Sequence, residues 1–70
     1  MDLRDAVIGR TYTVKEVKTG DEELEKFLFR LGCYSGEPVT VVSRLKSGCV
    51  VSIKDGRYNI DDGIAEAIRI

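Results

Sequence analysis

The chain has 70 residues, of which 43% are apolar and 33% charged, and 11 basic against 12 acidic residues give a net charge of −1. A domain of this size buries only about 60% of its unfolded surface, which leaves little room for the deep pocket of an enzyme. The balanced charge also argues against nucleic-acid binding, which depends on neutralising phosphates with Lys and Arg. We therefore expect one domain over residues 1–70 that is not an enzyme.

The composition also predicts a cytoplasmic protein without direct membrane insertion. The longest apolar runs have three residues, whereas a membrane helix needs about 20. Asp2, Arg4 and Asp5 interrupt the N-terminus where the hydrophobic segment of a signal peptide would begin. In a reducing cytosol, Cys33 and Cys49 are expected to be buried free thiols, with one disulfide as the alternative. No histidine is present, so the commonest general base is absent.

The N-terminal third of the chain predicts a lead-in and a strand. Residues 1–10 form the lead-in, and its apolar anchors are Leu3, Ala6, Val7 and Ile8. Residues 11–17 are rich in β-branched residues, which favours a strand. The alternation of apolar side chains breaks before Val17, so we expect a bulge near Lys15 or Glu16.

A helix is predicted next, ending at Leu31. Either Thr19 or Asp21 can cap its free N–H groups, because each side chain carries an acceptor oxygen at a suitable spacing. Apolar residues at helical spacing form one stripe, which consists of Leu24, Phe27, Leu28 and Leu31. Phe29 lies off this stripe and is expected to be partly exposed. Gly32 ends the helix, since glycine adopts the left-handed conformation at little cost.

The remaining residues predict short strands. Gly36 and Pro38 are typical of a turn followed by the start of a strand. Strands are expected over 39–44, 49–54, 57–60 and 67–70, with a short helical turn over 64–66. Asp55-Gly56 is typical of a two-residue type I′ hairpin. Five strands with one helix inserted after the first predict a mainly β fold, a small bent barrel.

The order of these signals resembles the FeoA family. The family's opening Gly-x-x-Tyr-x-Val is matched by Gly9, Tyr12 and Val14. Its helix end and next strand are matched by Leu31, Gly32, Cys33, Gly36, Val39 and Val41. Its closing pattern is matched by Gly56, Ile60, Ala65, Ile68 and Ile70. The chain departs from the family in two places, where Cys49 replaces a proline and Asn59-Ile60-Asp61 replaces an Ala-Leu-polar segment.

The resemblance implies an SH3-like barrel, similar also to the C-terminal domain of iron-dependent repressors of the diphtheria-toxin-repressor type. It implies an accessory role in ferrous iron uptake, in which the protein partner is the ferrous iron permease at the inner face of the membrane. That permease carries a cytosolic GTP-binding domain. The matching residues shape the barrel, so no catalytic residue is implied.

Partner binding is the function that the residues favour most. SH3-like barrels recognise peptides along grooves lined by aromatic residues, and aromatic residues with arginine dominate interface energetics. Candidate contact residues are Phe29, Tyr34, Arg57 and Tyr58. Tyr34 is the best of these because it lies in a turn, whereas the ring of Tyr58 can equally well pack in the barrel.

Two alternatives stay open beside partner binding. Fe²⁺ could be bound or sensed by Asp61, Asp62 and Glu66, which lie within one turn. Without histidine such a site would be all-oxygen and would favour Mg²⁺ or Ca²⁺, so helix capping is the preferred reading and no cofactor is expected. The second alternative is an RNA-binding small barrel, against which the acidic residues count.

Overall fold

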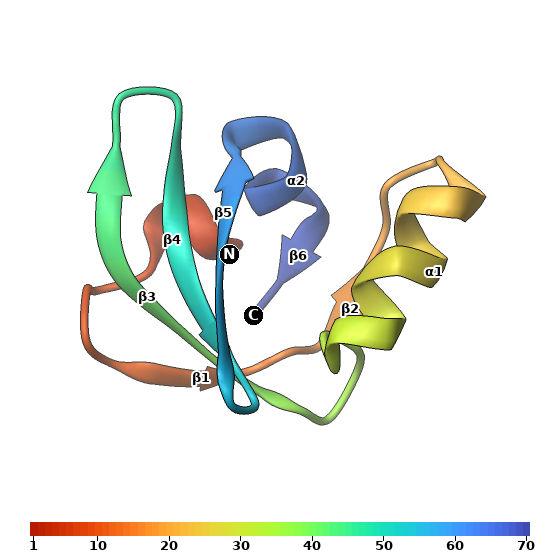
Figure 1. Cartoon of the computed structure of the whole chain (residues 1–70), viewed down its shortest axis with the longest axis horizontal. Helices are drawn as coiled ribbons and strands as arrows, with labels where there is room; N and C mark the ends of the chain where they lie inside the picture. Colours follow the sequence, from red (N-terminus) through yellow and green to blue (C-terminus); the bar gives the residue numbers. More distant parts are fainter.

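A four-stranded antiparallel sheet is the centre of the computed structural model, which describes residues 1–70 (Figure 1). Its strands lie in the order β1-β3-β4-β5, with the bounds Thr11–Thr13, Pro38–Leu45, Gly48–Ile53 and Gly56–Asp61. A second sheet pairs β2 (Glu16–Val17) with β6 (Ile68–Arg69). The helices are the 3₁₀ turn η1 (Leu3–Asp5), α1 (Glu22–Leu31) and α2 (Asp62–Ala67). The mainly β, SH3-like fold expected from the sequence is confirmed, with one long helix inserted early in the chain.

The predicted strand 11–17 is divided into β1 and β2, so the fold has six strands instead of five. The N–H of Val14 donates to the Glu37 carbonyl at 2.9 Å, on the β3 side, whereas the N–H of Lys15 donates to Arg69 at 2.7 Å. The chain therefore changes partner between these two residues. Val14 is almost fully buried at this point. The break in alternation that suggested a bulge reflects this change of sheet.

Helix α1 lies beside the barrel and not within it (Figure 1). Asp21 is the N-cap, and its carboxylate accepts the N–H groups of Glu23 and Leu24 at 3.0 and 3.2 Å. Leu28 is the one fully buried residue of the helix, and Phe27 is 46% exposed. The prediction that Phe27 belongs to the buried stripe is wrong, because a helix that touches the barrel along one line covers only a narrow face.

The core is one cluster of 14 buried residues, which come from both sheets and from all three helices. The predicted anchors Leu3 and Ala6 are buried in it, but Val7 and Ile8 are more than half exposed. The reason is a turn in which the N–H of Arg10 donates to the Val7 carbonyl and carries these two side chains outward. The lead-in is therefore anchored by its first half only.

The hairpin between β4 and β5 differs by one residue from the prediction. Ile53 pairs with Gly56, so the two loop residues are Lys54 and Asp55, and Lys54 alone among non-glycine residues has a positive φ, of 55°. Gly56 belongs to the strand, where a Cβ would collide with the ring of Tyr58. The predicted type I′ turn at Asp55-Gly56 is thus wrong, because Gly56 already pairs with Ile53 and the loop consists of Lys54 and Asp55.

Candidate functional site

The structure brings two of the four predicted contact residues together. The rings of Phe29 and Tyr34 stack with their centroids 4.6 Å apart and their planes at 29°. Phe29 is 61% exposed and Tyr34 is partly buried, so the stack presents aromatic surface to solvent. Arg57 and Tyr58 lie on β5 and make no ring contact or hydrogen bond with this pair. The predicted contact residues therefore form one surface pair and two separate positions.

The end of α1 positions this stack. Gly32 adopts φ 97°, and its N–H donates to Phe29, while the N–H of Cys33 donates to Leu28 at 2.9 Å. Cys33 is buried, which fixes the chain immediately after the helix. Because Gly32 is left-handed and Cys33 is buried, the chain reverses direction after α1 and places the ring of Tyr34 against that of Phe29.

An ion pair borders the stack. Lys54 Nζ lies 3.0 Å from Glu37 Oε2, which ties the hairpin between β4 and β5 to the turn before β3. The stem of Lys54 covers Gly32, where a Cβ would lie 2.6 Å from Lys54 Cγ. We name Phe29, Tyr34, Glu37 and Lys54 together the aromatic patch.

The charges of the patch act on one another. The Glu37 carboxylate raises the pKa of Tyr34, because the neutral phenol can donate a hydrogen bond to it. Lys54 and then Tyr34 lower the pKa of Glu37, and Glu37 in turn raises the pKa of Lys54. Near neutral pH the patch therefore presents a phenol, a carboxylate and an ammonium group around a hydrophobic ring. Such a mixture of an aromatic anchor and polar groups is typical of a protein–protein contact.

Two of the three candidate metal ligands, Asp61 and Glu66, have other partners in this structure. Asp61 caps α2, and its carboxylate accepts the N–H of Ile64 at 2.8 Å. Glu66 lies 3.3 Å from Arg4. Asp62 is exposed in the first turn of α2. The chain contains no group of three or more His, Cys, Asp or Glu residues arranged to hold a metal ion.

Both cysteines are free and buried, as expected. Burial raises the pKa of Cys33 to about 11. Burial also raises the pKa of Cys49. Because the thiolate is the reactive and metal-binding form, neither group is activated for nucleophilic chemistry.

The sequence reasoning missed a polar network that holds the N-terminus. Asp2 is only 6% exposed, and Arg4 donates to its two carboxylate oxygens at 3.0 and 2.9 Å. Arg44 of β3 donates to the carbonyl groups of Leu3 and Ala6 at 3.1 and 2.7 Å. The one local signal was the spacing of Asp2 and Asp5, which form a capping box around η1.

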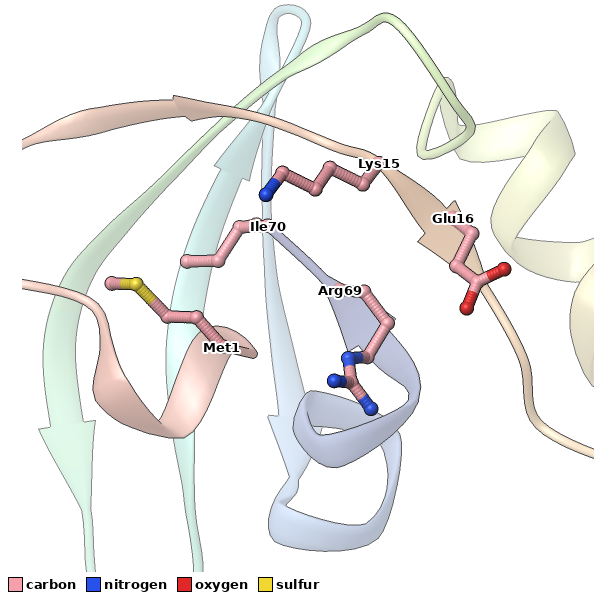
Figure 2. A pocket seen from close by; sticks show the side chains of 5 residues that line it. All are labelled: Met1, Lys15, Glu16, Arg69 and Ile70. Carbon is pink, nitrogen blue, oxygen red and sulfur yellow. The ribbon is translucent and has the colours of Figure 1, made fainter.

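A shallow hollow of about 310 Å³ lies where β2 and β6 meet the N-terminus (Figure 2). Its lining residues are Met1, Lys15, Glu16, Arg69 and Ile70. In Figure 2 the side chain of Lys15 extends above that of Ile70, while Glu16 points away from both. None of the predicted contact residues or candidate metal ligands lines this hollow. No helix of the chain is long and apolar enough to span a membrane.

The fold defines the class of the protein, a small SH3-like barrel that carries a solvent-exposed aromatic patch beside an inserted helix. The chain belongs to the FeoA family, since the family model described as the FeoA domain matches residues 1–70. The resemblance seen in the sequence is thereby confirmed. No curated protein matches the chain.

Two solved structures share the fold. One is the FeoA protein of Stenotrophomonas maltophilia in complex with zinc, with a TM-score of 0.83 and 19% identity over 97% of this chain and 86% of that one. It is described as a prokaryotic SH3 domain protein and a candidate activating factor of bacterial ferrous iron transport. The other is described as an iron uptake regulatory protein (FeoA), with a TM-score of 0.82 and 20% identity over 97% of this chain and 91% of that one.

Proposed function

We propose that this protein is a non-catalytic accessory factor of ferrous iron uptake that acts in the cytoplasm. Its partner is the cytosolic GTP-binding part of the ferrous iron permease. Membership of the FeoA family supports the accessory role, and the Stenotrophomonas relative is described as a candidate activating factor of the same transport. The protein then acts by binding, since the family's shared residues shape the barrel.

The aromatic patch is the contact surface in this proposal. The observation that carries it is the stacking of Phe29, 61% exposed, on Tyr34 at 4.6 Å. A stacked pair has fewer rotamers to lose on binding than two free side chains have, which lowers the entropic cost of docking. The Glu37–Lys54 ion pair at its border supplies polar groups for specificity.

The experiment is a binding titration of the whole protein against the purified GTP-binding domain, nucleotide-free, with GDP and with a GTP analogue. We expect Phe29→Ala and Tyr34→Ala each to weaken binding about 10-fold or more, the usual effect of truncating an aromatic hot spot. Phe27→Ala is the matched control, because Phe27 is an exposed aromatic residue of the same helix outside the patch. We expect it to change the affinity less than about twofold, the level of a peripheral contact.

Two results would overturn the proposal. Absence of binding at tens of micromolar in every nucleotide state would contradict the proposal that the protein acts by binding the GTP-binding domain of the permease. Unchanged affinity for Phe29→Ala and Tyr34→Ala would overturn the assignment of the contact to the aromatic patch. Two of the three carboxylates of the Fe²⁺-binding alternative have partners within the chain, Asp61 in the cap of α2 and Glu66 in an ion pair with Arg4, and no three ligands are arranged to hold a metal ion.

A further inference from the structure

Strand β5 is an open edge of the four-stranded sheet. Its only neighbour in the sheet is β4. The hydrogen-bond ladder between the two strands ends where the carbonyl of Ser47 accepts the N–H of Asp62 at 2.9 Å. The register continues without a shift from this end to the pair of Ile53 and Gly56. In an antiparallel pair, alternate residues direct their backbone groups to the neighbour. Arg57 and Asn59 therefore direct their N–H and C=O groups away from β4.

This edge lacks three of the devices that protect edge strands, namely proline, a bulge and very short length, although it carries the charged residues Arg57 and Asp61. β5 has six residues with no proline and no irregularity in its register, whereas β1, the opposite edge, has three residues. The outward-directed residues Arg57, Asn59 and Asp61 are all exposed to solvent. The unpaired backbone groups of β5 are thus available to another strand.

The charges on β5 are self-complementary. Arg57, Asn59 and Asp61 lie on one exposed face of the strand, and neither Arg57 nor Asp61 takes part in an ion pair within the chain. Asp61 caps α2 through Oδ1, which leaves Oδ2 for another partner. When two such strands run antiparallel with Asn59 opposite itself, each Arg57 faces Asp61 of the other copy. If the two strands shift so that a different pair of outward-directed residues lies opposite, Arg57 no longer faces Asp61. In two of these shifted registers like charges face each other, Arg57 opposite Arg57 or Asp61 opposite Asp61. Opposite charges across a ladder stabilise pairing, and like charges oppose it.

We propose that β5 pairs antiparallel with β5 of a second copy of this chain, centred on Asn59, and joins the two four-stranded sheets into one. The contact is isologous, as a two-fold dimer requires. Two strands of this length bury less surface than a standard interface, so the dimer belongs to the weak and transient class. We therefore expect a weak dimer, with a dissociation constant on the order of 1 mM or somewhat lower. This proposal is independent of the proposed permease contact.

The test uses the purified whole protein alone, by sedimentation equilibrium from about 10 μM to 1 mM, a range that spans the affinity expected of such an interface. We expect a monomer at the low end and a growing dimer fraction at the high end. Concentration-dependent amide shifts in ¹⁵N NMR spectra are expected to fall on residues 56–61.

Two variants probe the edge itself. Asn59→Pro removes an N–H that points away from β4, so it leaves the ladder within the chain intact and abolishes dimer formation. Arg57→Asp places like charges opposite Asp61 and weakens the dimer at least 10-fold. Arg30→Asp is the matched control, because Arg30 is also exposed and outside any ion pair but lies on α1. Circular dichroism checks that each variant is folded.

A mixing experiment tests the register. Arg57→Asp and Asp61→Arg are each expected to be monomeric alone, whereas an equimolar mixture regains the dimer, because both cross-strand pairs are then of opposite charge. Because Asp61→Arg also removes the N-cap of α2, its circular dichroism spectrum must match that of the wild type before mixing. A monomer at 1 mM would overturn the proposal, and so would a dimer that Asn59→Pro and Arg57→Asp leave unchanged. Shifts confined to Phe27, Phe29 and their neighbours would place self-association on α1 and would equally overturn it.

Discussion

The ring of Phe29 stacks on the ring of Tyr34 with 4.6 Å between their centroids. This contact joins α1 to the turn that leads into β3, at a point where the helix has already ended at Gly32. The pair lies at the surface, since Phe29 is mostly exposed. The stack therefore holds two aromatic side chains in place at the surface. The free energy of the contact between the rings can be measured without a binding partner.

A double-mutant cycle measures the coupling between the two rings. We expect Phe29→Ala and Tyr34→Ala to show a coupling of about 0.5–1.5 kcal/mol in the free energy of unfolding, the usual value for a stacked aromatic pair. Urea denaturation of the single and double variants gives this energy. Phe27→Ala paired with Tyr34→Ala is the control and should be additive, because Phe27 does not stack on Tyr34. Additivity of the first pair as well would contradict the prediction.

Substitution of Gly32 is expected to be costly for two separate reasons. Its φ of 97° is left-handed, and a new Cβ would lie 2.6 Å from Lys54 Cγ. The backbone conformation alone costs about 1–2 kcal/mol for an L-residue. We therefore expect Gly32→Ala to lower the free energy of unfolding by more than Gly20→Ala. Gly20 also has a positive φ, of 75°, but its surroundings are open.

The contact with Lys54 can be isolated in the same experiment. Relative to each parent protein, Lys54→Ala should be less destabilising in the Gly32→Ala background than in the wild type, because it removes the side chain that the new Cβ meets. Urea denaturation midpoints provide the comparison. Equal losses for the two glycine variants would show that the stem of Lys54 moves aside without cost.

Asp2 is expected to make stability depend on acidic pH. The hydrogen bond from the Arg4 side chain is the main cause that lowers the pKa of Asp2 below its ordinary value of 3.8. A carboxylate with a lowered pKa in the folded state stabilises that state at pH values above its unfolded pKa. This contribution disappears as the pH falls from about 4 through the folded pKa.

The comparison of wild type with Asp2→Asn measures this effect. At pH 6–7 the variant should melt at a lower temperature, and the difference should shrink as the pH is lowered below about 4, because protonation removes the charge from Asp2. Glu23→Gln serves as the control, since Glu23 is an exposed carboxylate outside this network. A difference that stays constant from pH 7 to pH 2.5 would show that the charge of Asp2 does not contribute.

The phenol of Tyr34 reports on the aromatic patch. Glu37 raises its pKa, first through a hydrogen bond and then through its charge, while Lys54 opposes this. In an ultraviolet titration of Glu37→Gln we expect the pKa of Tyr34 to fall toward its ordinary value of 10.0. Tyr34→Phe identifies which of the three tyrosines gives the signal. An unchanged titration curve would mean that the phenol and Glu37 do not interact in solution.

Much of the fold was readable from local signals. The helix, its end at Gly32, and the strands after Pro38 follow from periodicity and from residues with special backbone preferences. The buried state of both cysteines and the partial exposure of Phe29 were also predictable. For the helix, its end and the turns, the deciding interaction lies within a few residues of the chain.

The predictions were wrong where the local structure depends on hydrogen bonds or pairing with residues that are distant in the sequence. The division of residues 11–17 into β1 and β2 depends on the carbonyl groups of Glu37, which directly precedes β3, and of Arg69 in β6, which accept the neighbouring N–H groups of Val14 and Lys15. The hairpin turn lies one residue earlier than predicted, because the register of the whole β4–β5 ladder pairs Ile53 with Gly56. No local pattern contains these partners.

The candidate site shows the same division. The sequence by itself determined that Phe29 leaves the apolar stripe and that Tyr34 sits in a turn, because helical spacing and glycine conformation are local properties. Only the tertiary structure decided that the two rings stack and that Lys54 of the β4–β5 hairpin pairs with Glu37 before β3. It also placed Arg57 and Tyr58 on β5, outside the aromatic patch. The physical reason is that these contacts depend on how α1 and the β4–β5 hairpin pack around the barrel, which long-range burial determines.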